Sequence, residues 1–331
     1  MALFGCCRTK SSRQKGKNMT GQKLNAASAV KKKMSMKKSG TLFYVTMIAI
    51  PLLQFVIFYV IVNFNSILMA FQNYDNSTGK EVITFTWDNF AYFFSADVVA
   101  DLWLCIKNSL MYLALNVFVV MPVSLLFSYY VFKKFRMAKL FKVIMFLPSI
   151  VCSTAMVIFY KYYVNDALSG MFGGPVIGPT FNAHQQGVLI VFYLLMSFSG
   201  NILLYINAMC QTPESVIEAA RIDGAKEGQI FLHVVVPQIW GTIVSLLVIF
   251  FAWVATNQAY LFTFYGFNAN REYQTIGYYL FNMVQDGRFT GTALEQNYRK
   301  ASALGLMLTL IVAPVTILVR NLMLKYGPKE D

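Results

Sequence analysis

The chain has 331 residues, of which 57% are hydrophobic and 13% charged, and its mean hydropathy is +0.52. A soluble domain carries about 25% charged residues, so this composition excludes an ordinary soluble protein and favours a membrane protein. The net charge of +13 does not indicate nucleic-acid binding, because residues 1–41 hold eleven Lys and Arg and no acid, whereas the rest is almost neutral.

The first 41 residues form a basic segment with few large apolar side chains. Such a composition cannot bury a core, so residues 1–41 are predicted to be a disordered cytoplasmic tail that can lie on anionic membrane lipid. The segment is not a cleaved signal peptide, because the apolar run after it is long enough to span a membrane. Residues 42–327 are predicted to form one transmembrane domain.

Membrane-spanning segments come next along the chain. A span needs about 20 mostly apolar residues, and lipid leaves the helix as the solution for each of them. Six segments qualify, at 42–62, 108–132, 140–163, 187–209, 240–264 and 301–324. The predicted fold class is therefore all-α, a polytopic membrane protein with about six transmembrane helices.

The distribution of Lys and Arg predicts the orientation of these spans. The connection after the second span is short and basic, with Lys133, Lys134, Arg136 and Lys139, whereas the connection 63–107 is mainly acidic. Basic loops face the cytoplasm. With six spans, both termini are then cytoplasmic.

Several classes of chemistry have no support in the sequence. There is no GxxxxGK[ST] loop for nucleotide phosphate, no Asp or Glu within any predicted span, and no metal-ligand spacing around His184 and His233. No cofactor and no catalytic or metal-binding residue is predicted. If the chain takes part in active transport, a partner must supply the energy.

The connection 210–239 is acidic on a side where topology favours basic residues, so it needs another purpose. Thr212 is predicted to cap a helix whose first residue is Pro213, and Gly224 is predicted to break it. The segment should form a helix, a tight turn and a second helix.

Five residues of this connection resemble the EAA loop of the inner-membrane subunits of binding-protein-dependent ABC importers. They are Glu218, Ala219, Ala220, Gly224 and Pro237, at that family's spacing, with Val234 and Val236 at its two other apolar positions. The resemblance implies the type I importer fold and a coupling helix that docks into a cytoplasmic ATPase. By position, Glu218, Ala219, Ala220 and Gly224 form the contact core, and Arg221 and Asp223 are weaker candidates.

Other segments resemble the carbohydrate-uptake branch of these permeases, namely Lys107–Leu110, Phe146–Pro148 and Thr212–Glu214. The resemblance implies uptake of a sugar or sugar-derived solute across a bacterial inner membrane. It also implies a second permease subunit, two cytoplasmic ATPase subunits and an extracytoplasmic solute-binding protein as partners. Hydrolysis of ATP then belongs to the separate ATPase subunits, and this chain is not itself an enzyme.

Sugar hydroxyls pair with amides, and sugar rings stack on aromatic faces. The fourth and fifth predicted spans hold both kinds of side chain, so the candidate path residues are Tyr193, Asn201, Tyr205, Trp253, Asn257 and Gln258. Of these, the adjacent amides Asn257 and Gln258 are the strongest candidates. The alternative interpretation is that such side chains bond neighbouring helices together.

Two other classes of function remain open from the sequence. A secondary carrier or passive channel for a polar solute would need no ATPase and would make the EAA resemblance coincidental. An export or assembly scaffold with six spans has no positive feature in its favour.

Overall fold

The computed structural model describes residues 43–75, 82–167, 170, 183–288 and 290–328, so the predicted tail 1–41 lies outside the described residues. The chain divides into two compact units, Met1–Asn65 and Ser66–Asp331. The described part of the first unit is helical and includes a π-helical stretch at Val56–Ile61. It continues into α2 (Val62–Ala70), so the whole helix runs Phe43–Ala70 and has the length of a membrane span.

The second unit is built mainly of helices. Its first part comprises β1 (Gln72–Asp75), β2 (Val82–Phe85), α3 (Asp88–Ala91), a 3-10 turn (Tyr92–Phe94), α4 (Ala96–Leu115), a π-helical turn (Asn116–Val120) and α5 (Met121–Phe132). Its middle comprises α6 (Ala138–Ile150), α7 (Ser153–Ala167), α9 (Ala183–Met209), α10 (Glu214–Ile222) and α11 (Glu227–Ile230). Its last part comprises a π-helical turn (Phe231–Val235), α12 (Val236–Gln238), α13 (Trp240–Trp253), α14 (Leu261–Tyr265), a 3-10 turn (Arg271–Tyr273), α15 (Ile276–Gln285) and α16 (Thr292–Tyr326).

The prediction of a helical, multi-span membrane protein is confirmed. Among the described residues, four helices are long and apolar enough to cross a membrane: Phe43–Ala70, Ala96–Phe132, Gln185–Met209 and Thr292–Tyr326. Two bent pairs, Ala138–Ile150 with Ser153–Asp166 and Glu227–Gln238 with Trp240–Trp253, raise the number to six if each pair is one span. The hairpin of β1 and β2, in which Gln72 pairs with Phe85, is an addition that the sequence did not predict.

The third and fifth predicted spans are not single straight helices in the structure. α6 and α7 meet at an angle of 101°, after Pro148 near the end of α6 and an extended Val151. Proline lacks the N–H that the helix would use and crowds the preceding turn, which accounts for the bend.

The fifth predicted span, 240–264, ends as a helix at Trp253. Ala259 and Tyr260 beyond it have positive φ angles of 48° and 61°. The Asn257 Oδ1 atom accepts a hydrogen bond of 2.9 Å from the Ala259 N–H, and the Thr275 hydroxyl donates one of 2.7 Å to the Asn257 carbonyl. Side-chain bonds of this kind replace helical ones and hold the chain in an irregular turn.

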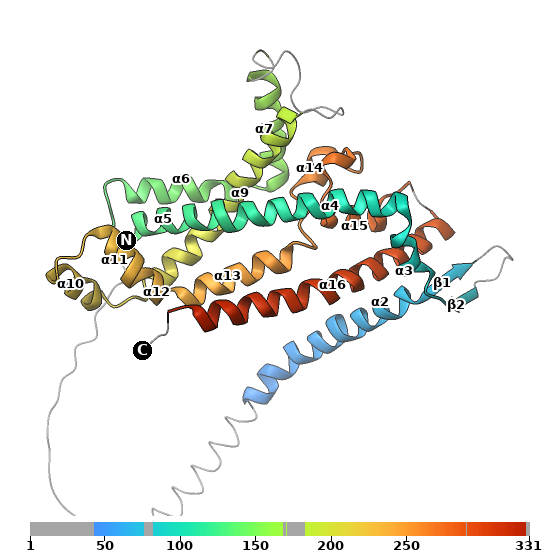
Figure 1. Cartoon of the computed structure of the whole chain (residues 1–331), viewed down its shortest axis with the longest axis horizontal. Coiled ribbons are helices and arrows are strands. Elements are labelled where there is room, and N and C mark those ends of the chain that lie inside the picture. The colour runs from blue at the N-terminus through green and yellow to red at the C-terminus, as the bar shows by residue number, and fades with distance from the viewer. Residues whose placement is uncertain (1–42, 76–81, 168–169, 171–182, 289, 329–331) are drawn as a thin grey trace, which may run out of the picture. The chain divides into compact units, whose positions relative to one another are not determined.

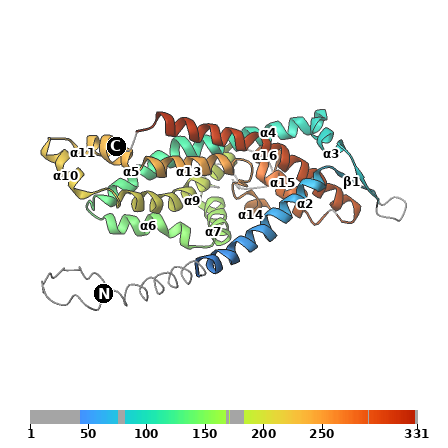
Figure 2. The same cartoon turned by 90° about the horizontal axis from the view of Figure 1, so that it is seen from below.

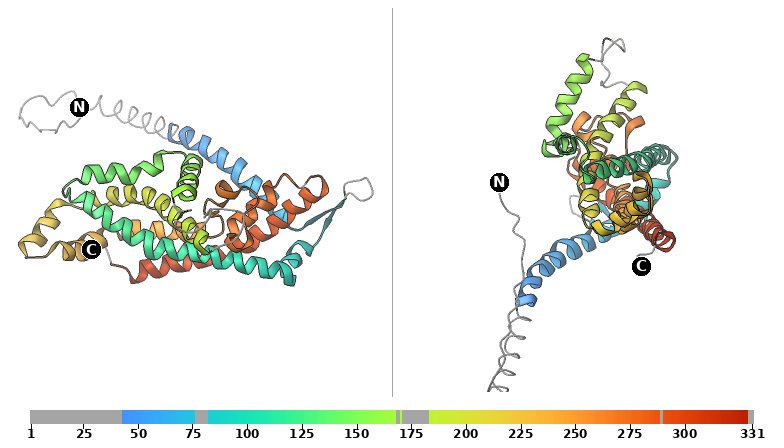
Figure 3. Two further views of the ribbon diagram at one scale, coloured as in Figure 1. Left: turned by 90° about the horizontal axis from the view of Figure 1, so that it is seen from above. Right: turned by 90° about the vertical axis from the view of Figure 1, so that its left-hand side faces the viewer.

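The long helices of the second unit run side by side (Figure 1). α5 packs along α9, and α13 packs along α16. The same views place α10 and α11 at one end of this bundle and the β1–β2 hairpin at the other (Figures 1 and 2). The right-hand view of Figure 3 faces the end that carries α10 and α11.

Two buried clusters of the second unit matter for function. One surrounds Tyr112, Phe192 and Phe264, where α4, α9 and α14 meet. The other surrounds Tyr205 and Val235. It packs the last turns of α9 and much of α13 against the segment that carries α10. The second cluster therefore connects the segment 210–239 to the membrane helices.

Candidate functional site

The segment 210–239 forms the predicted helix, turn and helix. Gly224, with a φ of 81°, follows α10 and reverses the chain toward α11. Its N–H donates to the Arg221 carbonyl, and the Ala225 N–H donates to the Ala220 carbonyl, each over 3.0 Å. This is the hydrogen-bond pattern of a helix that ends on a left-handed residue. An added Cβ at Gly224 would meet no atom within 4 Å, so backbone conformation rather than crowding requires the glycine.

The predicted cap of this helix is wrong. Pro213 is extended, with φ −61° and ψ 131°, so α10 begins at Glu214 and no side chain caps it. The Thr212 hydroxyl is buried and has no hydrogen-bond partner within the described residues. The helix begins one residue later than expected, which leaves the threonine too far from the free N–H groups of the first turn.

α10 has a buried side and an exposed side. Ile217 is buried in the cluster around Tyr205 and anchors α10 to the membrane helices. On the other side Glu218 and Ala219 are exposed, and Ile222 is 86% exposed. A large apolar side chain that projects into solvent beside a carboxylate is typical of a contact surface for another protein.

The remaining predicted coupling residues differ in how far they are exposed. Asp223 and Gly224 are exposed, as is Arg221, whereas Ala220 is half-buried against the cluster around Tyr205. The Glu218 side chain has no hydrogen bond or ion pair within the part of the chain that the structure describes. Contact of these residues with an ATPase stays a prediction.

The sequence did not single out Glu227 as a site residue. In the structure its carboxylate accepts a hydrogen bond of 2.7 Å from the Tyr129 hydroxyl and lies 2.9 Å from Lys133 Nζ. It also lies 3.1 Å from the Arg221 guanidinium. The only sequence signal was the acidic excess of the segment, which does not identify the partners, since those on α5 are about a hundred positions away.

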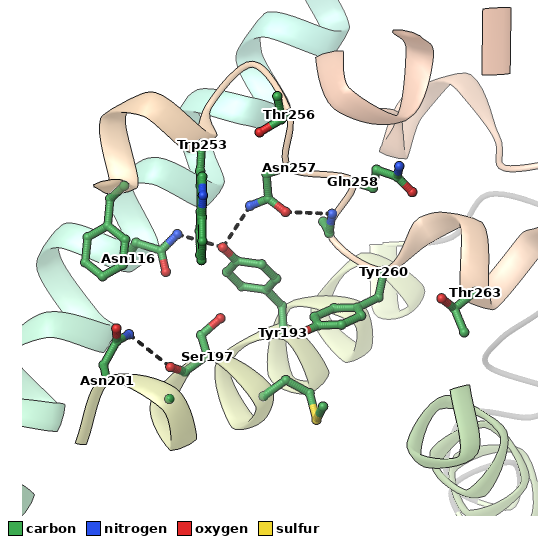
Figure 4. Close-up of a pocket in the computed structure, with 14 residues that line it drawn as sticks. Asn116, Tyr193, Ser197, Asn201, Trp253, Thr256, Asn257, Gln258, Tyr260 and Thr263 are labelled. Carbon is green, nitrogen blue, oxygen red and sulfur yellow. Dashed lines mark hydrogen bonds between the residues drawn. The ribbon is translucent and has the colours of Figure 1, made fainter. Parts of the chain in front are cut away.

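A pocket of about 440 Å³ opens beside α9 and the irregular turn after α13 (Figure 4). Its lining residues are Asn116, Tyr193, Met196, Ser197, Gly200, Asn201, Phe250, Trp253, Thr256, Asn257, Gln258, Ala259, Tyr260 and Thr263. Five of the six predicted path residues are among them. The sixth, Tyr205, is fully buried in the neighbouring cluster and does not line this pocket.

The Tyr193 hydroxyl lies at the centre of the pocket wall. It accepts hydrogen bonds from Asn116 Nδ2 over 2.6 Å and from Asn257 Nδ2 over 2.9 Å (Figure 4). Three elements far apart in the sequence are thereby joined at one atom. For Asn257 this bond supports the alternative interpretation of a contact that joins neighbouring segments, and its place in a solute path stays a prediction.

Gln258 is different from the other amides of the pocket. Its side chain points away from Asn257 and Tyr193 in Figure 4, and it has no hydrogen bond within the described residues. Asn201, by contrast, donates to the Ser197 carbonyl of its own helix over 3.0 Å. Together with the Trp253 ring, which is 57% exposed, Gln258 offers the amide and the aromatic face that a sugar would use.

The pocket lies near the middle of the membrane helices. Asn116 is near the centre of the helix Ala96–Phe132, which has 37 residues. At about 1.5 Å per residue, Asn116 is roughly 24 Å from the α5 end of a helix that is about 55 Å long. The pocket is thus far from both ends of this helix, and its role as part of a solute path stays a prediction.

Single cysteines in the turn after α13 provide a test of access to the pocket. We expect replacements at Thr256, Asn257 and Gln258 to react consecutively with a small water-soluble thiol reagent, because this segment is not helical. Cysteine at Ala259, which is only 3% exposed, should stay protected and serves as the control. Labelling of every third or fourth position from 253 to 260 would contradict the described turn.

Comparisons with known proteins agree with this geometry. The family of binding-protein-dependent transport system inner membrane components matches residues 109–329. The chain is 27% identical over 154 residues to the alpha-glucoside transport system permease protein AglF of Rhizobium meliloti (strain 1021), and this region is 46% of the chain and 43% of the relative. It is 24% identical over 194 residues to the polygalacturonan/rhamnogalacturonan transport system permease protein YteP of Bacillus subtilis (strain 168), covering 55% of the chain and 59% of that relative.

The fold is also similar to solved structures. One is a chain of a bacterial ABC transporter involved in the import of the acidic polysaccharide alginate, with a TM-score of 0.68 and 17% identity over 89% of this chain and 99% of that one. Another is a chain of the alginate transporter in complex with a pentasaccharide-bound periplasmic protein, with a TM-score of 0.65 and 18% identity, covering 86% of this chain and 94% of that one. At this identity the likeness establishes the fold, which is that of an ABC transporter permease.

Proposed function

Because this chain belongs to the family of inner membrane components of binding-protein-dependent transport systems, we propose that it is a membrane-spanning subunit of an ATP-driven importer for a sugar or sugar-derived solute. One observation carries this proposal: the two helices that enter and leave the exposed α10 segment, α9 and α13, also line the pocket. A displacement of α10 therefore acts on the pocket walls. Alternating access needs two positions of these packed helices, one that opens the pocket to each side of the membrane.

The proposed orientation places α10 in the cytoplasm. The Trp240 Nε1–H donates to the Met323 carbonyl over 3.1 Å, so the end of α16 lies beside the beginning of α13. The basic connection with Lys133 and Lys134 lies near the same end, because Lys133 contacts Glu227. The rule that basic loops face inward then gives a multi-pass protein of a bacterial inner membrane with its C-terminus in the cytoplasm. The N-terminus is proposed to lie on the same side.

A sugar is the proposed solute class on two grounds. Relatives are described as permeases for alpha-glucosides and for polygalacturonan or rhamnogalacturonan. The pocket offers a free amide and exposed aromatic faces, which suit a polyhydroxylated ring. Charged side chains are absent from the residues that line it.

The proposed partners follow from the exposed surfaces and the family. Two cytoplasmic ATPase subunits would hydrolyse ATP, one of them in contact with Glu218, Ala219 and Ile222. A second permease subunit would close the open side of the pocket, and an extracytoplasmic binding protein would deliver the solute. This chain would then contribute the path and not the hydrolysis.

Uptake by cells that express the full transporter tests the proposed function. We expect uptake of the sugar to stop when ATP is depleted while the membrane potential is held, and to continue when ion gradients are collapsed with ATP present. The purified chain should co-elute with an ATPase and a second permease. Uptake that follows the ion gradient and needs no ATPase would instead establish a secondary carrier.

A further inference from the structure

Glu227 joins the α10 segment to a helix that is not its neighbour in the sequence. Its carboxylate contacts Arg221 of α10 on one side and both Tyr129 and Lys133, at the end of α5, on the other. The distances are 3.1 Å, 2.7 Å and 2.9 Å, respectively. We name these four residues the α5 junction.

The burial of Lys133 distinguishes the α5 junction from an ordinary ion pair at the protein surface. The Lys133 side chain is only 6% exposed, whereas that of Glu227 is 44% exposed. A buried ammonium needs its partner, because removal of the carboxylate would leave the charge unpaired away from water. The Tyr129 ring also packs against Phe231, with the ring centres 4.8 Å apart. Movement of Glu227 must therefore move the end of α5 with it.

The long helix Ala96–Phe132, of which α5 is the last part, lines the pocket with Asn116 near its centre. α5 continues without a break from the π-helical turn that begins at Asn116. Asn116 donates to the Tyr193 hydroxyl, which also binds Asn257. From Tyr129 to Asn116 the helix covers about 20 Å at 1.5 Å per residue. A packed helix of this length transmits displacement as a rigid element.

We propose that the α5 junction transmits the movement of α10 to Asn116, as a second route to the pocket besides the chain-connected helices α9 and α13. Glu227 is a positioning residue in this route, since it does not line the pocket and acts through Lys133 and Tyr129 of α5 and Arg221 of α10. The inference rests on the proposed importer function. It adds a specific residue pair, Glu227 and Lys133, through which ATP hydrolysis and pocket opening are linked.

Comparison of a single and a double variant in the assembled transporter separates transmission from simple structural support. In Glu227→Gln the buried Lys133 is unpaired, and in Glu227→Gln with Lys133→Met this unpaired charge is gone. We expect the double variant to recover membrane abundance and ATP hydrolysis. We also expect it to import about fivefold less solute per ATP hydrolysed than the unmodified transporter, because fivefold is the lower end of the usual coupling between two sites. Recovery of full solute import per ATP in the double variant would overturn the proposal, because the junction would then be only structural.

Asp101→Asn is the matched control. It breaks an ion pair of 3.3 Å with Arg271, a residue whose side chain is 75% exposed. Exposed pairs of this kind contribute little, so import per ATP should be unchanged. A loss equal to that of Glu227→Gln would mean that any ion pair of the chain has this effect, which would also overturn the proposal.

A second measurement does not depend on transport. Spin labels at Leu126 on α5 and Ser215 on α10, both exposed, report the distance between the two helices in the purified full-length chain. We expect a narrow distance distribution in the unmodified protein and a broad one in both Glu227→Gln and the double variant. A narrow distribution in the double variant would show that α10 is held without the junction. If instead the unmodified complex shows no ATP-driven uptake while these distributions broaden as expected, the importer function fails and the junction stands.

Discussion

The Glu218→Lys variant is expected to reach the membrane in normal amounts and to lose sugar uptake roughly a hundredfold. The Glu218 side chain is exposed and has no partner within the described residues, so its reversal disturbs nothing in the folded subunit. At a contact with a basic group of an ATPase, a like charge costs about 3 kcal/mol, which corresponds to the expected loss. Uptake by cells and the amount of subunit in isolated membranes measure the two quantities.

Two replacements of Gly224 separate the turn from the contact surface. Asparagine tolerates the positive φ that Gly224 adopts, so Gly224→Asn keeps the turn and adds a side chain on the exposed side. We expect Gly224→Asn to accumulate normally and to reduce uptake in part. Gly224→Trp, which is both strained and bulky, should abolish it. Near-normal uptake in Glu218→Lys and Gly224→Trp, at normal membrane abundance, would remove this surface from the coupling role.

The Gly277→Ala variant is expected to unfold at a lower temperature and to lose most uptake. A Cβ at Gly277 would lie within 3.0 Å of the backbone of Thr256 and Asn257, so one of the two segments must move. Overpacking of this kind costs about 1–3 kcal/mol, and contact with backbone atoms belongs at the upper end. Because the segment that must move carries Asn257 and Gln258, the pocket changes as well. Thermal unfolding of the purified subunit and solute uptake are the measurements.

Gly305→Ala provides the control for Gly277→Ala. Gly305 is a helical residue of α16 whose added Cβ would meet no atom within 4 Å. Alanine is favoured over glycine inside a helix by about 1 kcal/mol, so Gly305→Ala should leave the protein as stable or more stable. Equal unfolding temperatures for the two variants would contradict the close contact described for Gly277.

Hydropathy predicted where the membrane helices lie because lipid leaves few alternatives for the backbone. It did not predict where they bend. Pro148 is one of several prolines in a helical protein, and proline is often tolerated within membrane helices. The turn at 254–260 contains neither Gly nor Pro. It is formed by Asn257 and by Thr275, a residue of a different element, and such a contact cannot be read from local composition.

The candidate sites were predictable to different degrees. Gly224 and the exposed residues of α10 follow a local pattern of spacing, so the turn was predicted correctly. Gln258 was predicted to line a cavity, but only the structure distinguishes it from Asn257, which is bonded to Tyr193. Glu227 has partners from α5, 98 positions away in the case of Tyr129, and no local pattern indicates a contact of that range.

The irregular turn after α13 also has a consequence for how the subunit is made. The segment carries non-helical backbone and the amide of Gln258 on a wall of the open pocket. Such groups are costly in contact with lipid and acceptable only beside protein or water. A subunit that has not assembled is therefore expected to be less stable in the membrane than one whose pocket is covered by a companion subunit.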